Sequence, residues 1–340
     1  MDLSSRYLGF HLPHPLLLGA SPLVDDLDLV RRVEDAGASA IVMHSVFEEQ
    51  IDAREQAGPD RNHESSEKTR YFPPNRSDFQ LDANEYLEQL RRVRAAVDIP
   101  VIASLNGVGD GRWLDYARLL DQAGAHALEL NVYRLATQPE LRGEQLEDEL
   151  ISMLRHVRER TPIPVAVKLS PFHSALANVA TRLVAAGADG LVLFNRFYQP
   201  DIDLERLEVR QQLELSTPAE LPLRLRWLAV LSAQIQQTLG VSGGVHSALD
   251  VLKCVAVGAD GVQLVSAVMA RGPRVFSEMQ SALTRWLEAH EYDSLAQLRD
   301  RLNLSHCPDG AAYERANYLH LLRAGSRLTA AHRPGPRPRR

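Results

Sequence analysis

Residues 256–266 have the sequence AVGADGVQLVS, and three earlier stretches repeat its plan: EDAGASAIVMHS at 34–45, DQAGAHALELN at 121–131 and AAGADGLVLFN at 185–195. Each stretch joins a helix end to a Gly-Ala step and a short apolar run. The glycine suits the position just after a helix, where the backbone needs a positive φ. The apolar runs are too short for helices and rich in Val, Leu and Ile, which is typical of parallel strands buried on both faces.

A second set of apolar runs lies between these repeats, beginning at Pro15, Ile99, Ile163 and Thr238. Interleaving the two sets gives eight strands. Amphipathic helical patterns separate or follow them, at 27–36, 83–97, 112–123, 145–160, 174–186, 224–237, 247–257 and 274–290. Eight alternating strand–helix units predict an α/β fold, a closed (β/α)8 TIM barrel. A doubly wound open sheet is the alternative.

The predicted barrel fills residues 1–330 as a single domain, with a helical extension at 291–330 and a disordered basic tail at 331–340. Two connections, 46–82 after the second strand and 196–223 after the sixth, are longer than ordinary loops. Long loops after barrel strands lie on the catalytic face, so both are candidate lids.

Composition narrows the class of protein. The net charge of −6 does not favour nucleic acid or an anionic membrane as a partner. The two cysteines, Cys254 and Cys307, have no metal-binding spacing and fit a reducing compartment. We find no signal peptide and no apolar run near the roughly 18 residues of a membrane span. A cytoplasmic protein without a membrane partner is expected.

The predicted strands end in polar residues or glycine. In chain order these are Ser21, His44, Ser45, Asn106, Asn131, Lys168, Ser170, Asn195, Ser242, Gly243, Gly244 and Ser266. Any one of them could be a structural cap or turn residue. Active sites of such barrels form at the carboxyl ends of the strands, so together these residues predict one pocket.

Lys168 and the SGGV turn at 242–245 carry the most specific signals. A lysine that leaves a buried strand needs an anionic partner, either a ligand or an internal carboxylate. Glycines after the seventh strand allow backbone N–H groups to approach a phosphate, and the helix that follows favours the anion. The usual phosphate site of these barrels lies after strands seven and eight.

These residues, in this order, resemble the dihydroorotate dehydrogenase family over roughly residues 3–290, most clearly in ALELN, VAVKLS, SGGVHSALDVLK and VGADGVQLVSA. Members of that family are FMN-binding (β/α)8 barrels that oxidise dihydroorotate to orotate in pyrimidine biosynthesis. The resemblance implies FMN contacts from Ala20, Ser21, Ser45, Asn106, Asn131 and Lys168, and phosphate contacts from Gly243, Gly244, Ser266 and Ala267. It also implies that Lys168 lies at the flavin N1–O2 edge and that Asn131 and Asn195 contact the substrate.

Several positions depart from the family pattern. His44-Ser45 replaces a lysine before serine on the second strand, and Arg134 stands where the family has a cysteine or serine base. Ala136 replaces a substrate asparagine, and Asn75 is only a loose substitute for another. An arginine stays protonated and is a poor base. By residue type, His44, Tyr133 or Ser170 could take its place, and His44 joins Lys168 and Asn131 as a catalytic candidate.

Three hypotheses follow. The first is an FMN-dependent dehydrogenase that acts on a CH–CH bond of a small anionic substrate. The second is a lyase in which Lys168 forms a Schiff base. The third is a catalytically silent flavin-binding or assembly protein. Because no cysteine cluster could hold an iron–sulfur centre, further electron transfer would need a separate partner, and a homodimer is a further expectation.

Overall fold

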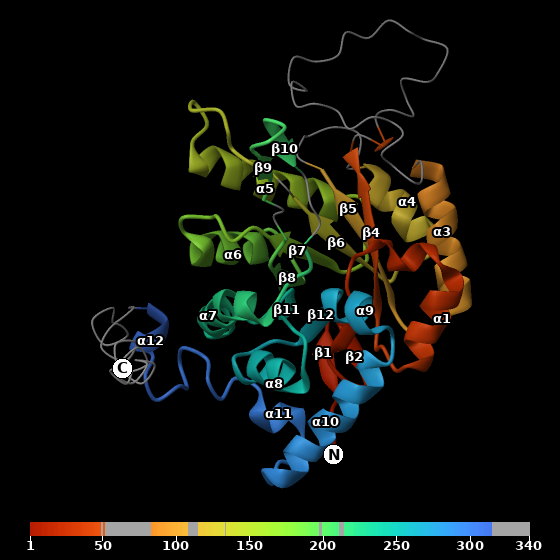
Figure 1. Cartoon of the computed structure of the whole chain (residues 1–340). Helices are drawn as coiled ribbons and strands as arrows, with labels where there is room; N and C mark the ends of the chain where they lie inside the picture. The colour runs from red at the N-terminus through yellow and green to blue at the C-terminus, as the bar shows by residue number, and fades with distance from the viewer. Residues whose placement is uncertain are drawn as a thin grey trace, which may run out of the picture.

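The computed structural model describes residues 1–48, 50–51, 83–107, 115–132, 134–196, 199–210 and 214–314. Eight parallel strands close into a barrel in the order β11-β12-β3-β4-β5-β6-β7-β8 (Figure 1). Their bounds are β3 Leu16–Leu18, β4 Ile41–Phe47, β5 Val101–Asn106, β6 Ala127–Asn131, β7 Val165–Leu169, β8 Gly190–Leu193, β11 Thr238–Ser242 and β12 Gly261–Leu264. The predicted TIM barrel is confirmed, and the open sheet is excluded.

Helices surround the barrel where the amphipathic patterns predict them. They are α1 Leu27–Asp35, α3 Ala83–Ala96, α4 Tyr116–Gln122, α5 Gly143–Arg158, α6 Leu176–Ala185, α7 Leu221–Ser232, α8 Ala248–Ala256 and α10 Val275–Ala289. Short helices η1 Pro22–Asp25, η4 Pro218–Glu220 and α9 Ser266–Arg271 lie in the loops after β3, β8 and β12. The glycines of the four repeats all have positive φ, between 93° and 109°, as predicted.

An N-terminal hairpin fills the bottom of the barrel. Strands β1 Ser5–Tyr7 and β2 Phe10–Leu12 pair antiparallel and lie below the barrel (Figure 1). Tyr7 and Leu8 join an apolar cluster inside the strands, separate from the larger cluster between strands and helices. Glycine makes this entry possible, since a Cβ on Gly190 would lie 2.7 Å from Leu8 Cδ2. The polar interior is therefore confined to the carboxyl half of the barrel.

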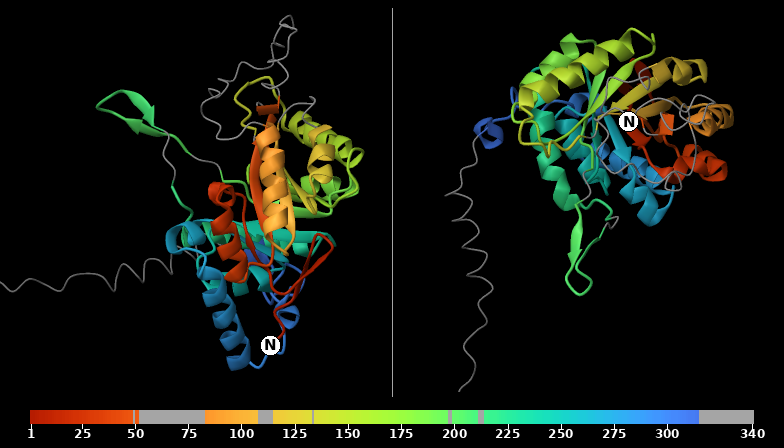
Figure 2. Two further views of the ribbon diagram at one scale, coloured as in Figure 1. Left: turned by 90° about the vertical axis from the view of Figure 1, so that its right-hand side faces the viewer. Right: turned by 90° about the horizontal axis from the view of Figure 1, so that it is seen from above.

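The long connection after β8 contains a hairpin, β9 Asp201–Asp203 and β10 Glu208–Arg210, that projects away from the barrel in both views of Figure 2. Past α10, the described chain contains the short helices α11 Leu295–Leu298 and α12 Ala311–Glu314. The predicted tail at 331–340 and most of the predicted lid at 46–82 lie outside the described residues. Within the described ranges, no helix has the length and apolar character needed to cross a membrane.

Candidate functional site

The carboxyl ends of β5, β6 and β7 bring three of the predicted residues side by side. Asn106 pairs in register with Asn131, and Asn131 pairs with Lys168. Side chains alternate along a strand, so Glu129 faces the same way as Asn131, one layer deeper in the barrel. This alternation builds a polar layer above the apolar floor.

Lys168 is bound inside this layer. Its side chain is 8% exposed, and Nζ lies 3.1 Å from Oε1 of Glu129, whose side chain is 1% exposed. The same ammonium donates to Gln263 Oε1 at 3.2 Å, and Gln263 Nε2 donates to Glu129 Oε2. The sequence left two partners open for Lys168, a ligand or an internal carboxylate, and the internal ion pair is present. An ammonium has three N–H donors, and the third has no hydrogen-bond partner among the described residues.

Asn131 has an unfilled acceptor in the same layer. Its Nδ2 donates to Ser45 Oγ at 3.4 Å, and Ser45 Oγ lies 2.7 Å from Ser104 Oγ. Asn131 Oδ1 is buried and has no hydrogen-bond partner in the described part of the chain. A register shift in β4 between Val42 and Ser45 sets Ser45 opposite Ser104. Since a buried acceptor without a partner costs about 1–3 kcal/mol, Asn131 marks a place where a ligand donor fits.

His44 lies apart from this layer, against η1 and α3. Its Nδ1 is 3.0 Å from Asp25 Oδ1, and its ring meets Tyr86 edge to face at 5.1 Å. Tyr86 belongs to the cluster between the barrel and the helices, and its hydroxyl donates to the His44 carbonyl at 2.8 Å. Burial lowers the pKa of His44, while the Asp25 charge opposes this shift. Burial also raises the pKa of Asp25.

The turn after β11 contains two of the residues for which the sequence predicts phosphate contacts, Gly243 and Gly244. Gly243 and Gly244 have φ of 85° and 81°, and Cβ atoms on them would lie 2.8 Å from Arg224 Nη2 and Leu221 N respectively. Glycine is therefore the residue that fits this turn. The Gly244 N–H donates to Ser216 Oγ at 3.1 Å, and Ser216 Oγ donates to Ser266 Oγ at 2.9 Å.

The sequence analysis did not single out Ser216 or Glu129. Ser216 lies in a long connection without periodicity, so no local pattern marks it. Glu129 did carry a signal, because a glutamate in the middle of the apolar run ALELN needs a buried cation. The remaining cofactor candidates lie nearby: Ala20 packs against the inner cluster, Ser21 Oγ donates to the Gly19 carbonyl, and Ala267 is buried in α9.

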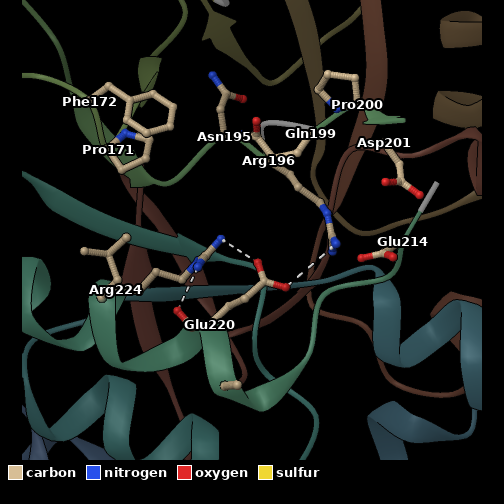
Figure 3. Close-up of a pocket in the computed structure, with 12 residues that line it drawn as sticks. Pro171, Phe172, Asn195, Arg196, Gln199, Pro200, Asp201, Glu214, Glu220 and Arg224 are labelled. Carbon is tan, nitrogen blue, oxygen red and sulfur yellow. Dashed lines mark hydrogen bonds and ion pairs between the residues drawn. The ribbon is translucent and has the colours of Figure 1, made fainter. Parts of the chain in front are cut away.

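A pocket of about 730 Å³ opens between the loops after β7 and β8 and the start of α7 (Figure 3). Asn195 and Phe172 line it from above, and Glu220 lies between Arg196 and Arg224, at 3.8 Å and 3.9 Å. Asn195 Nδ2 also donates to the Lys168 carbonyl at 3.4 Å. This contact joins Asn195, a lining residue of the pocket, to the backbone of Lys168.

At the position where the resemblance implies a base, this chain has Arg134. The Arg134 guanidinium forms an ion pair with Glu149 of α5. Ser170 Oγ accepts a hydrogen bond from the Phe172 N–H at 3.1 Å, so it acts as a turn residue. Tyr133 and Asn75 lie outside the described residues.

Comparisons with known proteins give a consistent result. A family model described as dihydroorotate dehydrogenase matches residues 79–287. The NAD-dependent dihydropyrimidine dehydrogenase subunit PreA of Escherichia coli (strain K12) is 23% identical over 318 residues, covering 87% of this chain and 76% of the relative. The catalytic subunit of dihydroorotate dehydrogenase B (NAD(+)) of Pyrococcus abyssi is 26% identical over 309 residues, covering 87% of this chain and 97% of the relative. That of Geobacillus sp. (strain WCH70) is 30% identical over 186 residues, covering 51% of this chain and 57% of the relative.

Proposed function

The chain belongs to the dihydroorotate dehydrogenase family, and from this premise we propose that it is an FMN-dependent dehydrogenase acting on a CH–CH bond of a small anionic substrate. One observation carries the proposal. Among the described residues, neighbouring strand ends present an ammonium with one N–H to spare, on Lys168, and a buried amide oxygen without a partner, on Asn131. The pyrimidine edge of a flavin carries hydrogen-bond acceptors as well as an N–H donor. It therefore complements the donor on Lys168 and the acceptor on Asn131.

The remaining cofactor contacts follow from the same arrangement. Ala20, Ser21, Ser45 and Asn106 would lie along the ring system. Gly243, Gly244, Ser266 and Ala267 would hold the phosphate, and Ser216 joins them because its hydroxyl already bridges Gly244 and Ser266. Bound there, FMN would supply the hydride acceptor of the reaction. The protein would supply orientation, charge and exclusion of water.

We propose that the substrate contacts Asn131 and Asn195, with Asn75 as a further candidate outside the described residues. Asn195 supports this role because it borders both the pocket and Lys168. By residue type His44 stays our candidate proton acceptor, although its ring lies apart from the polar layer, against Asp25 and Tyr86. Asp25 approaches its Nδ1, and a proton shared there would leave the Nε2 lone pair available.

The two alternative hypotheses fare differently. A Schiff-base lyase requires Lys168 Nζ free to attack a carbonyl, and here Nζ is held by the Glu129 carboxylate at 3.1 Å and by Gln263 Oε1 at 3.2 Å. A catalytically silent flavin-binding or assembly protein is the second candidate. The ion pair of Arg134 with Glu149 favours it, since no base is then present at that position.

Partners and location follow as proposals. Two relatives are named as catalytic subunits of NAD(+)-dependent dihydroorotate dehydrogenase B, and a third is a subunit of an NAD-dependent dihydropyrimidine dehydrogenase. We therefore propose a separate electron-transfer partner for this chain, alongside a homodimer, in the cytoplasm. The exposed side chains Ile202, Leu204, Leu207 and Val209 make the β9–β10 hairpin a candidate contact surface.

Absorbance tests the cofactor directly. Purified protein, reconstituted with FMN and freed of excess, should show a flavin spectrum near one FMN per chain. Replacing Asn131 by Ala should weaken FMN binding about tenfold, because one hydrogen bond contributes about 0.5–1.5 kcal/mol. Colourless protein that takes up no FMN at micromolar concentration would contradict the proposal.

A further inference from the structure

Glu129 is a buried carboxylate whose two oxygens are both engaged beneath the proposed flavin site. Its Oε1 lies 3.1 Å from Lys168 Nζ, and its Oε2 accepts from Gln263 Nε2. Gln263 closes the triangle by accepting from Lys168 at 3.2 Å. Three strands, β6, β7 and β12, therefore hold one compact charged group of three side chains.

This group is fixed from below and from the side. Burial, and then the Glu129 charge, raise the pKa of Tyr7 well above its ordinary value, so the phenol in the barrel floor stays neutral. Gly19 at the end of β3 lies against Gln263, since a Cβ there would be 3.0 Å from Gln263 Cβ. Two of the three donors of the ammonium are thus directed at Glu129 and Gln263, and Gln263 is itself packed closely against Gly19.

The charge balance has a consequence for a flavin beside Lys168. Reduction of the cofactor adds negative charge, which an uncompensated ammonium stabilises. Here the ammonium already has a carboxylate partner in a region of low dielectric, and the pair is close to neutral overall. Because the ammonium is shared with this carboxylate, it stabilises the reduced cofactor less than an unpaired ammonium would.

We infer that Glu129 is a positioning residue for the cofactor: it fixes the Lys168 ammonium and, as its counter-ion, keeps the reduction potential of bound FMN lower than an unpaired lysine would. The inference rests on the proposed FMN site. It concerns a residue that contacts Lys168, and it makes no demand on the identity of the substrate.

The test is the midpoint potential of the FMN-reconstituted full chain, measured anaerobically against a reference dye. Glu129→Gln keeps the shape and removes the charge. It should raise the ratio of reduced to oxidised cofactor at least tenfold at a fixed potential. For a two-electron couple this corresponds to a midpoint potential about 30 mV higher. Lys168→Met should lower the potential. Glu88→Gln, a half-exposed carboxylate on α3, is the matched control and should leave it unchanged.

A double variant separates positioning from a simple field effect. If Glu129 acts through the ammonium, Glu129→Gln should shift the potential much less in the Lys168→Met background than in the wild type. Equal shifts in both backgrounds would overturn the positioning role. An unchanged potential in yellow, folded Glu129→Gln protein would overturn the whole inference.

Two further results keep the test decisive. If Glu129→Gln does not fold, Glu129→Asp takes its place. Aspartate retains the charge but draws it back from Lys168 Nζ, so the midpoint potential of the bound FMN should lie above that of the wild type. A wild-type potential in Glu129→Asp would then contradict the inference. Failure of the wild-type chain to bind FMN would instead refute the proposed function, so the two failures are distinguishable.

Discussion

His14 is a buried histidine directly before β3, away from the proposed site. It is 5% exposed, and its Nδ1 accepts the Leu16 N–H at 3.2 Å. Burial lowers its pKa from 6.5 to about 4. Protonation would remove that acceptor and place a charge in the core. The neutral imidazole is therefore the form that the folded state favours.

This predicts a pH dependence of stability. Between pH 6.5 and about 4 the unfolded chain binds the proton that the folded His14 resists, so the free energy of unfolding falls as the pH is lowered through this window. The full effect is about 3 kcal/mol from a shift of this size. Urea unfolding at several pH values should show a flatter profile for His14→Asn than for the wild type. His11→Asn, on an exposed part of β2, is the control; identical profiles for His14→Asn and the wild type would refute the prediction.

Residue-level expectations succeeded where a single strand decided them. The need of Lys168 for an anionic partner follows from one buried strand, and the neighbourhood of Asn106, Asn131 and Lys168 follows from the pairing of three consecutive strands. Glu129 carries a local signal of its own, but its pairing with Lys168 depends on which side chains reach each other between strands. His44 illustrates the same limit, because a one-residue register shift in β4 determines whether His44 or Ser45 meets Ser104.

At the scale of elements, Arg299 ties the short helix α11 to the barrel. Its Nε and Nη2 donate to the two oxygens of Asp260 at 2.8 Å and 3.2 Å. Asp260 precedes β12, and its Oδ2 also accepts the Leu239 N–H of β11 at 2.8 Å. The Asp260 side chain is 8% exposed. Two strand starts and the C-terminal extension thus meet at one carboxylate.

Removing this arginine should weaken the whole barrel. Arg299→Met leaves the buried Asp260 without its cation, and breaking such a pair costs about 3 kcal/mol. Arg301→Met removes an exposed arginine whose one hydrogen bond within the described residues is to the Gln297 carbonyl, and it should change stability little. Chemical unfolding of both variants measures the difference. Equal stability of the two would mean that the extension contributes nothing to the barrel.

The elements themselves were largely predictable, because each strand–helix unit repeats a strong local pattern. The N-terminal hairpin was not, since strands of three residues show no periodicity. Its role is visible only through distant glycines such as Gly240 and Gly261, which leave room for Tyr7. The start of α7 at Leu221, three residues before the predicted 224, reflects Pro222 in its first turn.

At the scale of the whole molecule, the two halves of the proposed site come from different parts of the barrel. The proposed phosphate contacts and Lys168 come from the ends of β7, β11 and β12, within residues 79–287 that match the family. The departures from the family pattern, such as Arg134 and Ala136 after β6, fall on the proposed substrate side. We therefore expect FMN binding and activity on dihydroorotate to be separable in this chain.

Oxidation of dihydroorotate removes a hydride and a carbon-bound proton, and a positioned base contributes about 10²–10⁴ in rate. Arg134, at the position of that base, forms an ion pair with Glu149 and cannot accept a proton at neutral pH. His44 lies beside Asp25 and Tyr86, and burial lowers its pKa. We therefore expect dihydroorotate to reduce the bound FMN slowly or not at all, while dithionite reduces it completely.

Anaerobic stopped-flow absorbance with dihydroorotate measures this reduction in a single turnover. Arg134→Cys restores the base type of the family and should raise the rate about 10²-fold or more, whereas Arg31→Cys on exposed α1 should not. If His44 is the base, any wild-type rate should fall as His44 becomes protonated, at a pH below its ordinary value of 6.5, and His44→Ala should remove that dependence. Rapid reduction by dihydroorotate in both the wild type and His44→Ala would mean that neither His44 nor the family's base is needed, and the chain would then deprotonate its substrate through a residue outside these candidates.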